Sequence, residues 1–489
     1  MNNTSSNNIS TNNPDFIVDS RDDEVFAEDN LTENSEYPIE DEFKTKEAVD
    51  FANIYKQRNI VNIQKQLQTQ ALKETGYFDN IFDTMANLEW LRAAYINIAK
   101  NKGSMTPGMD GQSIKDFEKN LDENLENLAM IIDEGLFEPH PVRYIKIPKR
   151  NGKTRTISII TIRDRIVQEA LRMLIEPIFE PSFSPYSFAY RAGTSSKDAV
   201  LHLRQAGLKR PWVLESDIEA FFDNVSHAIL LGLIRRKIRD ESILKIIEKF
   251  LLSGAIDDGQ LVVTKQGIAQ GSILSPLLAN IYLSGFDNFI VKGYVEGNDS
   301  KKTVAYARYA DDFVVFCNSK AQAIALNEAI RGFLGSLELT ISSEKTAITR
   351  LSKGINFLGY QLKAVGFLNK AQVSIIIPKD TILSIKDKVT GLTMVKTKSA
   401  DFSPTDRAKI VEINRVVSAW SHMYKSADNA EKIFRNLDKF ILSATIVWLA
   451  KKHNLRIARA KRKFRHNGNI TIEDKKLILP SDVLQSKDN

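Results

Sequence analysis

Two adjacent carboxylates stand between two apolar runs in the segment RYADDFVVF, residues 308–316. The flanking sequences VAYARY and FVVFC have the pattern of two strands joined by a tight turn, which places Asp311 and Asp312 at the tip of a hairpin. Ionised carboxylates held against an apolar layer repel each other and lose hydration, so they persist where water reaches them or where a cation neutralises them. Two interpretations are therefore open: a solvated turn, in which Asp is common, and a metal site.

A third carboxylate, Asp217, ends the short apolar strand expected in WVLESDI. If this strand lies beside the hairpin, Asp217 meets Asp311 and Asp312 at one sheet edge, and such an oxygen cluster binds hard divalent cations. Two Mg²⁺ ions held there would activate a 3′-hydroxyl and stabilise the leaving pyrophosphate in nucleotidyl transfer. Asp223 lies nearby, but it precedes a helical run and is interpreted as an N-cap or turn acid.

The elements that position these acids are predicted from hydrophobic periodicity. Folded structure is expected from about Gln57, with a helix over 81–102 that the Pro- and Gly-containing stretch MTPGMDGQS (105–113) ends. A second helical pattern follows over 117–135. Residues 143–160 alternate as two strands around an Asn-Gly turn, which predicts a hairpin.

This hairpin is strongly basic near its turn. Its cationic side chains could bind a triphosphate or a nucleic-acid backbone, or they could simply protect an exposed edge strand from pairing. The sequence leaves both interpretations open. The residues are Lys146, Lys149, Arg150, Lys153 and Arg155.

Composition limits the class of protein. The chain has 489 residues, of which 43% are hydrophobic and 26% charged, enough for two or three domains with buried cores. The single cysteine, Cys317, excludes an internal disulfide framework and a Cys-rich zinc site, and it fits a reducing compartment. No apolar run reaches about 18 residues, and the N-terminus has no signal-peptide core, so we expect an intracellular protein that is neither secreted nor membrane-spanning.

The net charge of +6 conceals two oppositely charged parts. Residues 1–43 contain twelve acids and one arginine, so the remaining chain carries about +17. A strongly basic body attracts polyanions, most commonly nucleic acid, although such a charge also suits ribosome contact or solubility. The acidic head is expected to be a disordered tail, which either shields the basic surface or has no role.

With these residues in place, the chain resembles group II intron-encoded proteins, the reverse transcriptase and maturase family. Nine segments occur in the family's order over roughly residues 105–362, and an ordered set of this size is far more specific than a lone ADD motif. They are MTPGMDGQS, IPKRNGKTRTISI, RDRIVQEAL, SFAYRAGTSSKDAV, SDIEAFFDNVSH, QGIAQGSILSPLLANIYL, RYADDFVVF, SSEKT and INFLGYQL. A weaker resemblance continues through INRVVSAWSHMYKSADN and FILSATIVWLAKKHNLRIARAKRKFR, which look like the family's helical thumb and maturase domain.

The resemblance implies roles for individual residues. Asp217, Asp311 and Asp312 match the catalytic acids, and the Ile218 backbone carbonyl matches a further metal ligand. The residues matching nucleotide contacts are Gln270 and Gly271, either Phe221 or Phe222 as the aromatic that rejects a ribose 2′-hydroxyl, and Lys149 and Arg155 as the triphosphate clamp. Lys345 matches a lysine proposed as an acid for pyrophosphate, although its position favours an exposed lysine at a helix end.

The C-terminal part carries two further expectations. Family members with a Cys/His-rich DNA endonuclease have it at this end, whereas this sequence has no cysteine there, so we expect no DNA cleavage by that route. The segment KKHNLRIARAKRKFR (451–465) is an expected intron-RNA contact, with a solvated charged face as the alternative. Its basic residues are Lys451, Lys452, Arg456, Arg459, Lys461, Arg462, Lys463 and Arg465.

The resulting expectation is an α/β right-hand polymerase, with fingers and palm, followed by an all-α thumb and maturase domain. The expected segments are a tail (1–56), an N-terminal extension with fingers (57–210), the palm (211–370), the helical domain (371–470) and a C-terminal tail (471–489). The implied function is Mg²⁺-dependent copying of RNA into DNA and assisted splicing, in a cytoplasmic or organellar ribonucleoprotein. Its partners would be intron RNA, an RNA template, a DNA primer and dNTPs, with a homodimer left open. The alternatives are a defence- or CRISPR-associated reverse transcriptase and a splicing cofactor with little polymerase activity.

Overall fold

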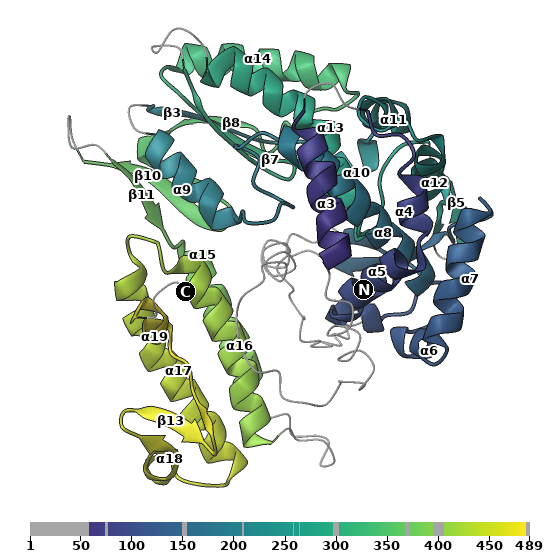
Figure 1. Cartoon of the computed structure of the whole chain (residues 1–489). Coiled ribbons are helices and arrows are strands. Elements are labelled where there is room, and N and C mark those ends of the chain that lie inside the picture. Colours follow the sequence, from purple (N-terminus) through teal and green to yellow (C-terminus); the bar gives the residue numbers. More distant parts are fainter. Residues whose placement is uncertain are drawn as a thin grey trace, which may run out of the picture. The chain divides into compact units, whose positions relative to one another are not determined.

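The computed structural model describes residues 58–73, 77–148, 154–207, 210–257, 259–263, 265–296, 303–366, 372–394 and 405–485. The predicted acidic tail (1–56) lies outside these residues. The described chain forms two compact units that interleave along the sequence (Figure 1). The first contains residues up to Phe183, Ala220–Gly285 and Leu337–Leu339, and the second contains the rest. The predicted boundaries between fingers, palm and helical domain stay predictions.

Helices make up most of the first unit. Its central helix, α8, is packed by α3, α4 and α5, and the Trp90 indole donates a hydrogen bond to the Ala170 carbonyl at 3.0 Å. The helix predicted over 81–102 is divided at Asn87, whose side chain accepts hydrogen bonds from the first turn of α5 and so starts a new helix. The helices are α3 (Arg58–Ala71), α4 (Phe82–Ala86), α5 (Leu88–Ala99), α6 (Ile114–Glu118), α7 (Leu121–Asp133), α8 (Ile162–Phe179), α10 (Phe221–Asn224), α11 (His227–Arg235) and α12 (Glu241–Leu252), with 3₁₀ turns η2 (Lys102–Met105) and η3 (Glu180–Ser182).

A four-stranded sheet completes the first unit. Its order is β2-β1-β4-β5, with β1 (Val142–Pro148), β2 (Thr154–Ile159), β4 (Ala255–Asp257) and β5 (Gln260–Val262). The predicted basic hairpin is confirmed as β1 and β2, paired antiparallel from Arg143 with Ile159 to Pro148 with Thr154. Its turn, with Lys149, Arg150 and Lys153, lies outside the described residues.

The second unit is built on an antiparallel sheet of order β6-β7-β3-β8. Its strands are β3 (Trp212–Asp217), β6 (Ala305–Tyr309), β7 (Asp312–Cys317) and β8 (Ala347–Arg350). Helix α14 (Lys320–Ser336) packs on β3, β7 and β8 (Figure 1), while α9 (Ser196–Ala206) packs on β6. All five residues of β6 are buried. Helix α13 (Ser275–Ile290), divided between the units at Gly285, continues into the π-helical turn η4 (Val291–Val295).

A second sheet and a helical region follow in the same unit. The sheet, of order β11-β10-β9, contains β9 (Ile355–Phe357), β10 (Tyr360–Val365) and β11 (Gln372–Ile376), and η5 (Leu351–Lys353) precedes it. One continuous core joins Phe316 of the first sheet to Leu362 of the second and to Trp420 and Phe434 of the helices. The helices are α15 (Lys379–Thr393), α16 (Asp406–Tyr424), α17 (Ala430–Lys452), α18 (Ile457–Phe464) and α19 (Pro480–Gln485).

The segment predicted as a C-terminal tail (471–489) is instead folded as far as Gln485. It carries the end of a small sheet, β12 (Arg465–His466), β13 (Asn469–Ile472) and β14 (Lys475–Lys476), and then α19, which packs on α16 and α17. Leu477, Leu479 and Val483 are buried because they fill the space beside those helices. Among the described helices, none has the length and apolarity needed to span a lipid bilayer.

Candidate active site

The three predicted acids belong to one edge of the β6-β7-β3-β8 sheet, the edge formed by the strand ends, as expected. Asp217 is the last residue of β3 and pairs across the strands with Asp312, the first residue of β7. Asp311 precedes it in the turn after β6. Because two antiparallel strands end in opposite directions, the end of β3 meets the start of β7, and the carboxylates share this edge. Asp217 is buried, with 7% of its surface exposed.

The backbone around these acids is tightly connected. Ala310 has a φ of 55°, in the left-handed region that an alanine adopts only under constraint. The Ile218 amide donates to the Asp311 carbonyl at 3.3 Å, and the Ser342 amide donates to the Asp217 carbonyl at 2.8 Å. These bonds fix the turn against the end of β3.

The electrostatics show a concentration of negative charge. The pKa of Asp312 is raised well above its usual value by burial, by the charges of Asp311 and Asp217, and by a hydrogen bond with Asp217. The Lys345 ammonium binds the Asp217 Oδ2 atom at 2.9 Å. Burial lowers the pKa of Lys345, but its interactions with Asp217 outweigh this effect and leave the pKa raised. The alternative of a helix-end lysine is wrong, because Lys345 lies in the turn before β8.

The donor set is chemically suited to a hard divalent cation. Carboxylate oxygens on one edge, one of them with a strongly disfavoured negative charge, are ligands that Mg²⁺ prefers. Within the described ranges, no group of three or more His, Cys, Asp or Glu residues has an arrangement that could hold a metal ion as it stands. The acids would therefore have to adjust around an ion, and the Ile218 carbonyl stays a predicted ligand.

The nucleotide loop, residues 267–271, contains the predicted nucleotide contacts Gln270 and Gly271 and lies in the first unit. The Ser158 amide on β2 donates to the Gln270 carbonyl at 2.7 Å. Gly271 has a φ of +100°, and a Cβ atom there would approach the Ile157 side chain and the Ser158 carbonyl at 3.0 Å. Glycine is therefore required both by the backbone conformation and by the close approach of β2. The same unit contains Arg155, which is partly exposed on β2, whereas Lys149 lies outside the described residues.

The two candidate phenylalanines differ in exposure. Phe221 is 2% exposed and packs edge-on against Phe222 and Tyr282 at ring-centroid distances of 5.5 and 6.3 Å. Phe222 is partly exposed and lines a cavity of about 150 Å³. Its carbonyl accepts a hydrogen bond from the Ile268 amide at 2.7 Å, which connects it to the segment leading to Gln270.

Asp223 lines the same cavity and is not a helix cap. It lies inside α10, whose N-cap is Ala220, and α11 begins after Ser226 without a side-chain cap. Burial raises its pKa. The N-cap interpretation was wrong because the helix begins two residues before Asp223, at Phe221.

His227, the last residue of the SDIEAFFDNVSH segment, has a role that the sequence interpretation did not assign. Its Nε2 atom is 2.7 Å from the Gly267 carbonyl and holds the start of the nucleotide loop. A histidine that ends a motif and begins a helix was the available signal.

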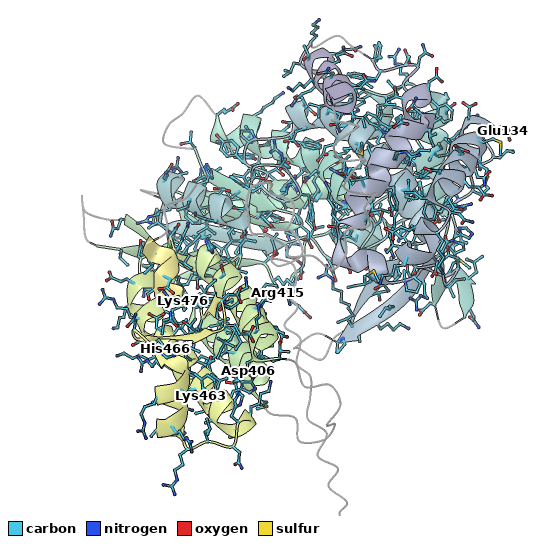
Figure 2. The ribbon with its side chains drawn as sticks, turned by 60° about the horizontal axis from the view of Figure 1, so that its bottom comes forward. Glu134, Asp406, Arg415, Lys463, His466 and Lys476 are labelled. Atoms are coloured by element: carbon cyan, nitrogen blue, oxygen red, sulfur yellow. The ribbon has the colours of Figure 1, made fainter. Side chains whose placement is uncertain are left out.

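The predicted RNA-binding residues are mostly exposed and extend over the end of α17, α18 and β12. In α18, Ala460 and Phe464 face the core while Lys461, Arg462 and Lys463 are exposed. Figure 2 shows Lys463 and His466 on this C-terminal part. Lys452 differs from the others, because its ammonium pairs with Asp406 at 2.9 Å. The remaining exposed members are Lys451, Arg456, Arg459 and Arg465.

Sequence comparisons relate the chain to known proteins. Residues 147–362 match the family described as "Reverse transcriptase (RNA-dependent DNA polymerase)". Protein YkfC of Escherichia coli is 35% identical over 335 residues, covering 62% of this chain and 88% of that protein. Group II intron-encoded protein LtrA of Lactococcus lactis subsp. cremoris is 31% identical over 327 residues, covering 55% of this chain and 54% of LtrA.

A third relative extends further along the chain. The putative COX1/OXI3 intron 1 protein of Saccharomyces cerevisiae is 26% identical over 487 residues, covering 85% of this chain and 58% of that protein. The chain thus spans a little over half the length of these two intron-encoded relatives. The ordered motifs, the acids on one sheet edge and these matches lead to one conclusion: the chain belongs to the group II intron-encoded reverse transcriptase family.

Proposed function

We propose that this protein copies RNA into DNA and also binds and helps to splice an intron RNA. The observation that carries the polymerase assignment is the cross-strand pair of Asp217 and Asp312, with Asp311 beside it in the hairpin turn. In this proposal the chain forms the fingers and palm of a right-hand polymerase, followed by a helical thumb and maturase region.

The three carboxylates would hold two Mg²⁺ ions, with the Ile218 carbonyl as an additional ligand. Bound Mg²⁺ supplies activation of the primer 3′-hydroxyl and neutralisation of the phosphate charge. The protein's own contribution is to hold the carboxylates on rigid strand ends. Lys345, whose raised pKa keeps it protonated at neutral pH, neutralises Asp217 in the metal-free protein and would supply positive charge or a proton to pyrophosphate during turnover.

The first unit would bind the incoming nucleotide. Phe222 is the better candidate for the sugar-contacting aromatic, because Phe221 is buried against Tyr282. Gln270 and Gly271 would contact the nucleotide through a loop fixed by Ser158. Arg155 and Lys149 would bind the triphosphate. The arginine would donate hydrogen bonds to two phosphate oxygens at once, and the lysine would act as a point charge.

The exposed basic residues of the C-terminal part would bind the intron RNA. Helix α18 is well suited, because it buries one face and presents Lys461, Arg462 and Lys463 to solvent. Cationic side chains on an exposed helix face bind phosphates without reading sequence. The protein would then act as an intracellular ribonucleoprotein with its intron, an RNA template, a DNA primer and dNTPs.

The test compares wild type with Asp311→Asn in two assays. Primer extension on an RNA template with Mg²⁺ and dNTPs should be lost in the variant, because one ligand of the metal site is removed. Exon ligation of the host intron at limiting Mg²⁺ should continue near the wild-type rate, because the acids lie apart in sequence from the basic region. Glu134→Gln, at an exposed glutamate after α7, is the control and should leave both activities unchanged.

Each outcome has a distinct meaning. Substantial Mg²⁺-dependent extension by Asp311→Asn would refute the acid assignment. If wild type extends primers but accelerates no ligation while binding RNA tightly, the maturase part fails and a defence-type reverse transcriptase becomes the better account. If it assists ligation without extending primers, the chain is a splicing cofactor.

A further inference from the structure

A fully buried ion pair connects the hairpin that carries Asp311 and Asp312 to helix α13. Arg308 on β6 and Asp287 on α13 each have side chains that are 1% exposed. The guanidinium binds the carboxylate through two atoms, with Nε to Oδ1 at 2.8 Å and Nη2 to Oδ2 at 2.6 Å. This bidentate geometry fixes the plane of the guanidinium group.

The remaining donors of Arg308 connect the pair to the turn and to a neighbouring segment. Nη1 donates to the Ala310 carbonyl at 2.8 Å, and Nη2 also donates to the Ser187 hydroxyl at 2.7 Å. The Tyr306 hydroxyl donates to the Asp287 Oδ1 atom at 2.7 Å, which completes the partners of the carboxylate. The Arg308 backbone is fixed as well, because its amide binds the Tyr186 carbonyl and its carbonyl binds the Phe188 amide, each at 2.9 Å.

The contact with Ala310 is the informative one. Ala310 holds its left-handed φ of 55° immediately before Asp311, and such a conformation needs support from its surroundings. Arg308 supplies that support from within the core, since its guanidinium is oriented by Asp287 and reaches the carbonyl of the strained residue. Two charges are costly to bury, and hydrophobic residues of similar volume often stabilise a core equally well. Stability therefore does not explain the pair, whereas orientation of the turn does.

We propose that Arg308, oriented by Asp287, is a positioning residue that holds the Ala310–Asp311 turn where the acids of this edge can share a cation. The inference rests on the proposed metal-dependent polymerase function. The Arg308 side chain is only 1% exposed, so it acts from within the core through the Ala310 carbonyl. Residues that orient metal ligands in this way change metal affinity about 10- to 100-fold when they are replaced.

The test measures metal binding without turnover. Mn²⁺ is titrated calorimetrically into metal-free wild type, Arg308→Lys and Ser187→Ala, and the Mg²⁺ concentration for half-maximal primer extension is measured in parallel. Lysine retains the charge but cannot bind Asp287, Ser187 and Ala310 together, so its Mn²⁺ dissociation constant should rise about tenfold or more. Ser187→Ala should show a smaller rise in the same direction. The Mg²⁺ requirement should shift by matching factors.

Ser374→Ala is the matched control. It removes a comparable hydroxyl, bonded to the Asp428 carboxylate at 2.6 Å, from β11 of the same unit. It should lower the melting temperature as Ser187→Ala does, while leaving Mn²⁺ affinity unchanged. Equal Mn²⁺ affinity in wild type and folded Arg308→Lys would overturn the inference. If Arg308→Lys does not fold, unchanged affinity in both Ser187→Ala and Tyr306→Phe overturns it.

Failure of the underlying function is distinguishable. Wild type that binds Mn²⁺ but extends no primer contradicts the polymerase proposal alone. Wild type that binds no Mn²⁺ contradicts both the metal site and the role of Arg308.

Discussion

Replacing Asp312 by Asn should stabilise the metal-free protein at neutral pH. The raised pKa of Asp312 means that the folded state disfavours its negative charge, because of burial and of the neighbouring Asp311 and Asp217 carboxylates. Charges about 5 Å apart repel by roughly 3 kcal/mol at an effective dielectric of about 20, and the Lys345 ammonium offsets part of this. Asparagine removes the charge and still donates to Asp217, so we expect the free energy of unfolding to rise by about 1 to 3 kcal/mol.

The pH dependence follows from the direction of the shift. In the unfolded chain Asp312 has its ordinary pKa of 3.8, whereas the folded protein binds the same proton more tightly. Stability from this group is therefore fully present below about pH 4 and is lost as the pH rises through the folded pKa, by at most about 1.4 kcal/mol per pH unit. The Asn variant lacks this loss, so the two proteins should converge in stability toward pH 4.

Urea unfolding in EDTA at several pH values between 4 and 8 measures both effects. Asp116→Asn is a control of opposite sign, since hydrogen bonds with Lys119 and Ser113 lower the pKa of Asp116 to about 2. That variant should lose stability above about pH 4. The reasoning is refuted if Asp312→Asn is less stable than wild type at pH 7.5 without metal, or if the two proteins show the same pH slope. Added Mg²⁺ should stabilise wild type more than the variant.

Two further predictions concern the nucleotide loop and the basic surface. Gly271→Ala should lower the melting temperature and raise the KM for dNTPs, because strain of about 1 to 3 kcal/mol arises at its positive φ, whereas Gly232→Ala, inside α11 with open space around it, should be neutral or stabilising. Equal effects of the two substitutions would contradict this account. A variant with four substitutions to Gln, at Lys461, Arg462, Lys463 and Arg465, should weaken intron-RNA binding more than extension on a generic template. Each lost phosphate contact should reduce the slope of log binding constant against log salt concentration by about 0.7 to 0.9. An unchanged slope together with an unchanged affinity would show that these basic residues form only a solvated charged surface.

The sequence was most informative where local pattern and site chemistry coincide. The β6-β7 hairpin is evident from two apolar runs around a short polar turn. The metal-site hypothesis required β3 to lie beside this hairpin, and the structure pairs β3 with β7. Lys345 was less predictable, because its contact with Asp217 depends on where the turn before β8 lies relative to β3. No local pattern contains that information.

The partners of buried charges were not predictable either. Arg308 interrupts an apolar strand, which is a signal of function, but its partner Asp287 lies on a preceding helix, and any acid in the chain could have filled that role. The C-terminal tail was misjudged for a related reason. The apolar positions of LILPSDVLQ form too short a pattern to predict folding, and they become ordered only because α16 and α17 offer a surface to cover.

The strand order of the β6-β7-β3-β8 sheet also determines when this sheet can assemble during synthesis. Strand β3 pairs only with β7 and β8 in this sheet, and both are translated after it. At about 5 to 20 residues per second, β3 waits on the order of 5 to 20 seconds for its first neighbour. Meanwhile Val213 and Leu214, fully buried in the finished fold, belong to a strand with both edges unpaired. Nascent chains stalled in this interval would thus expose an unpaired apolar strand, which makes them prone to aggregation.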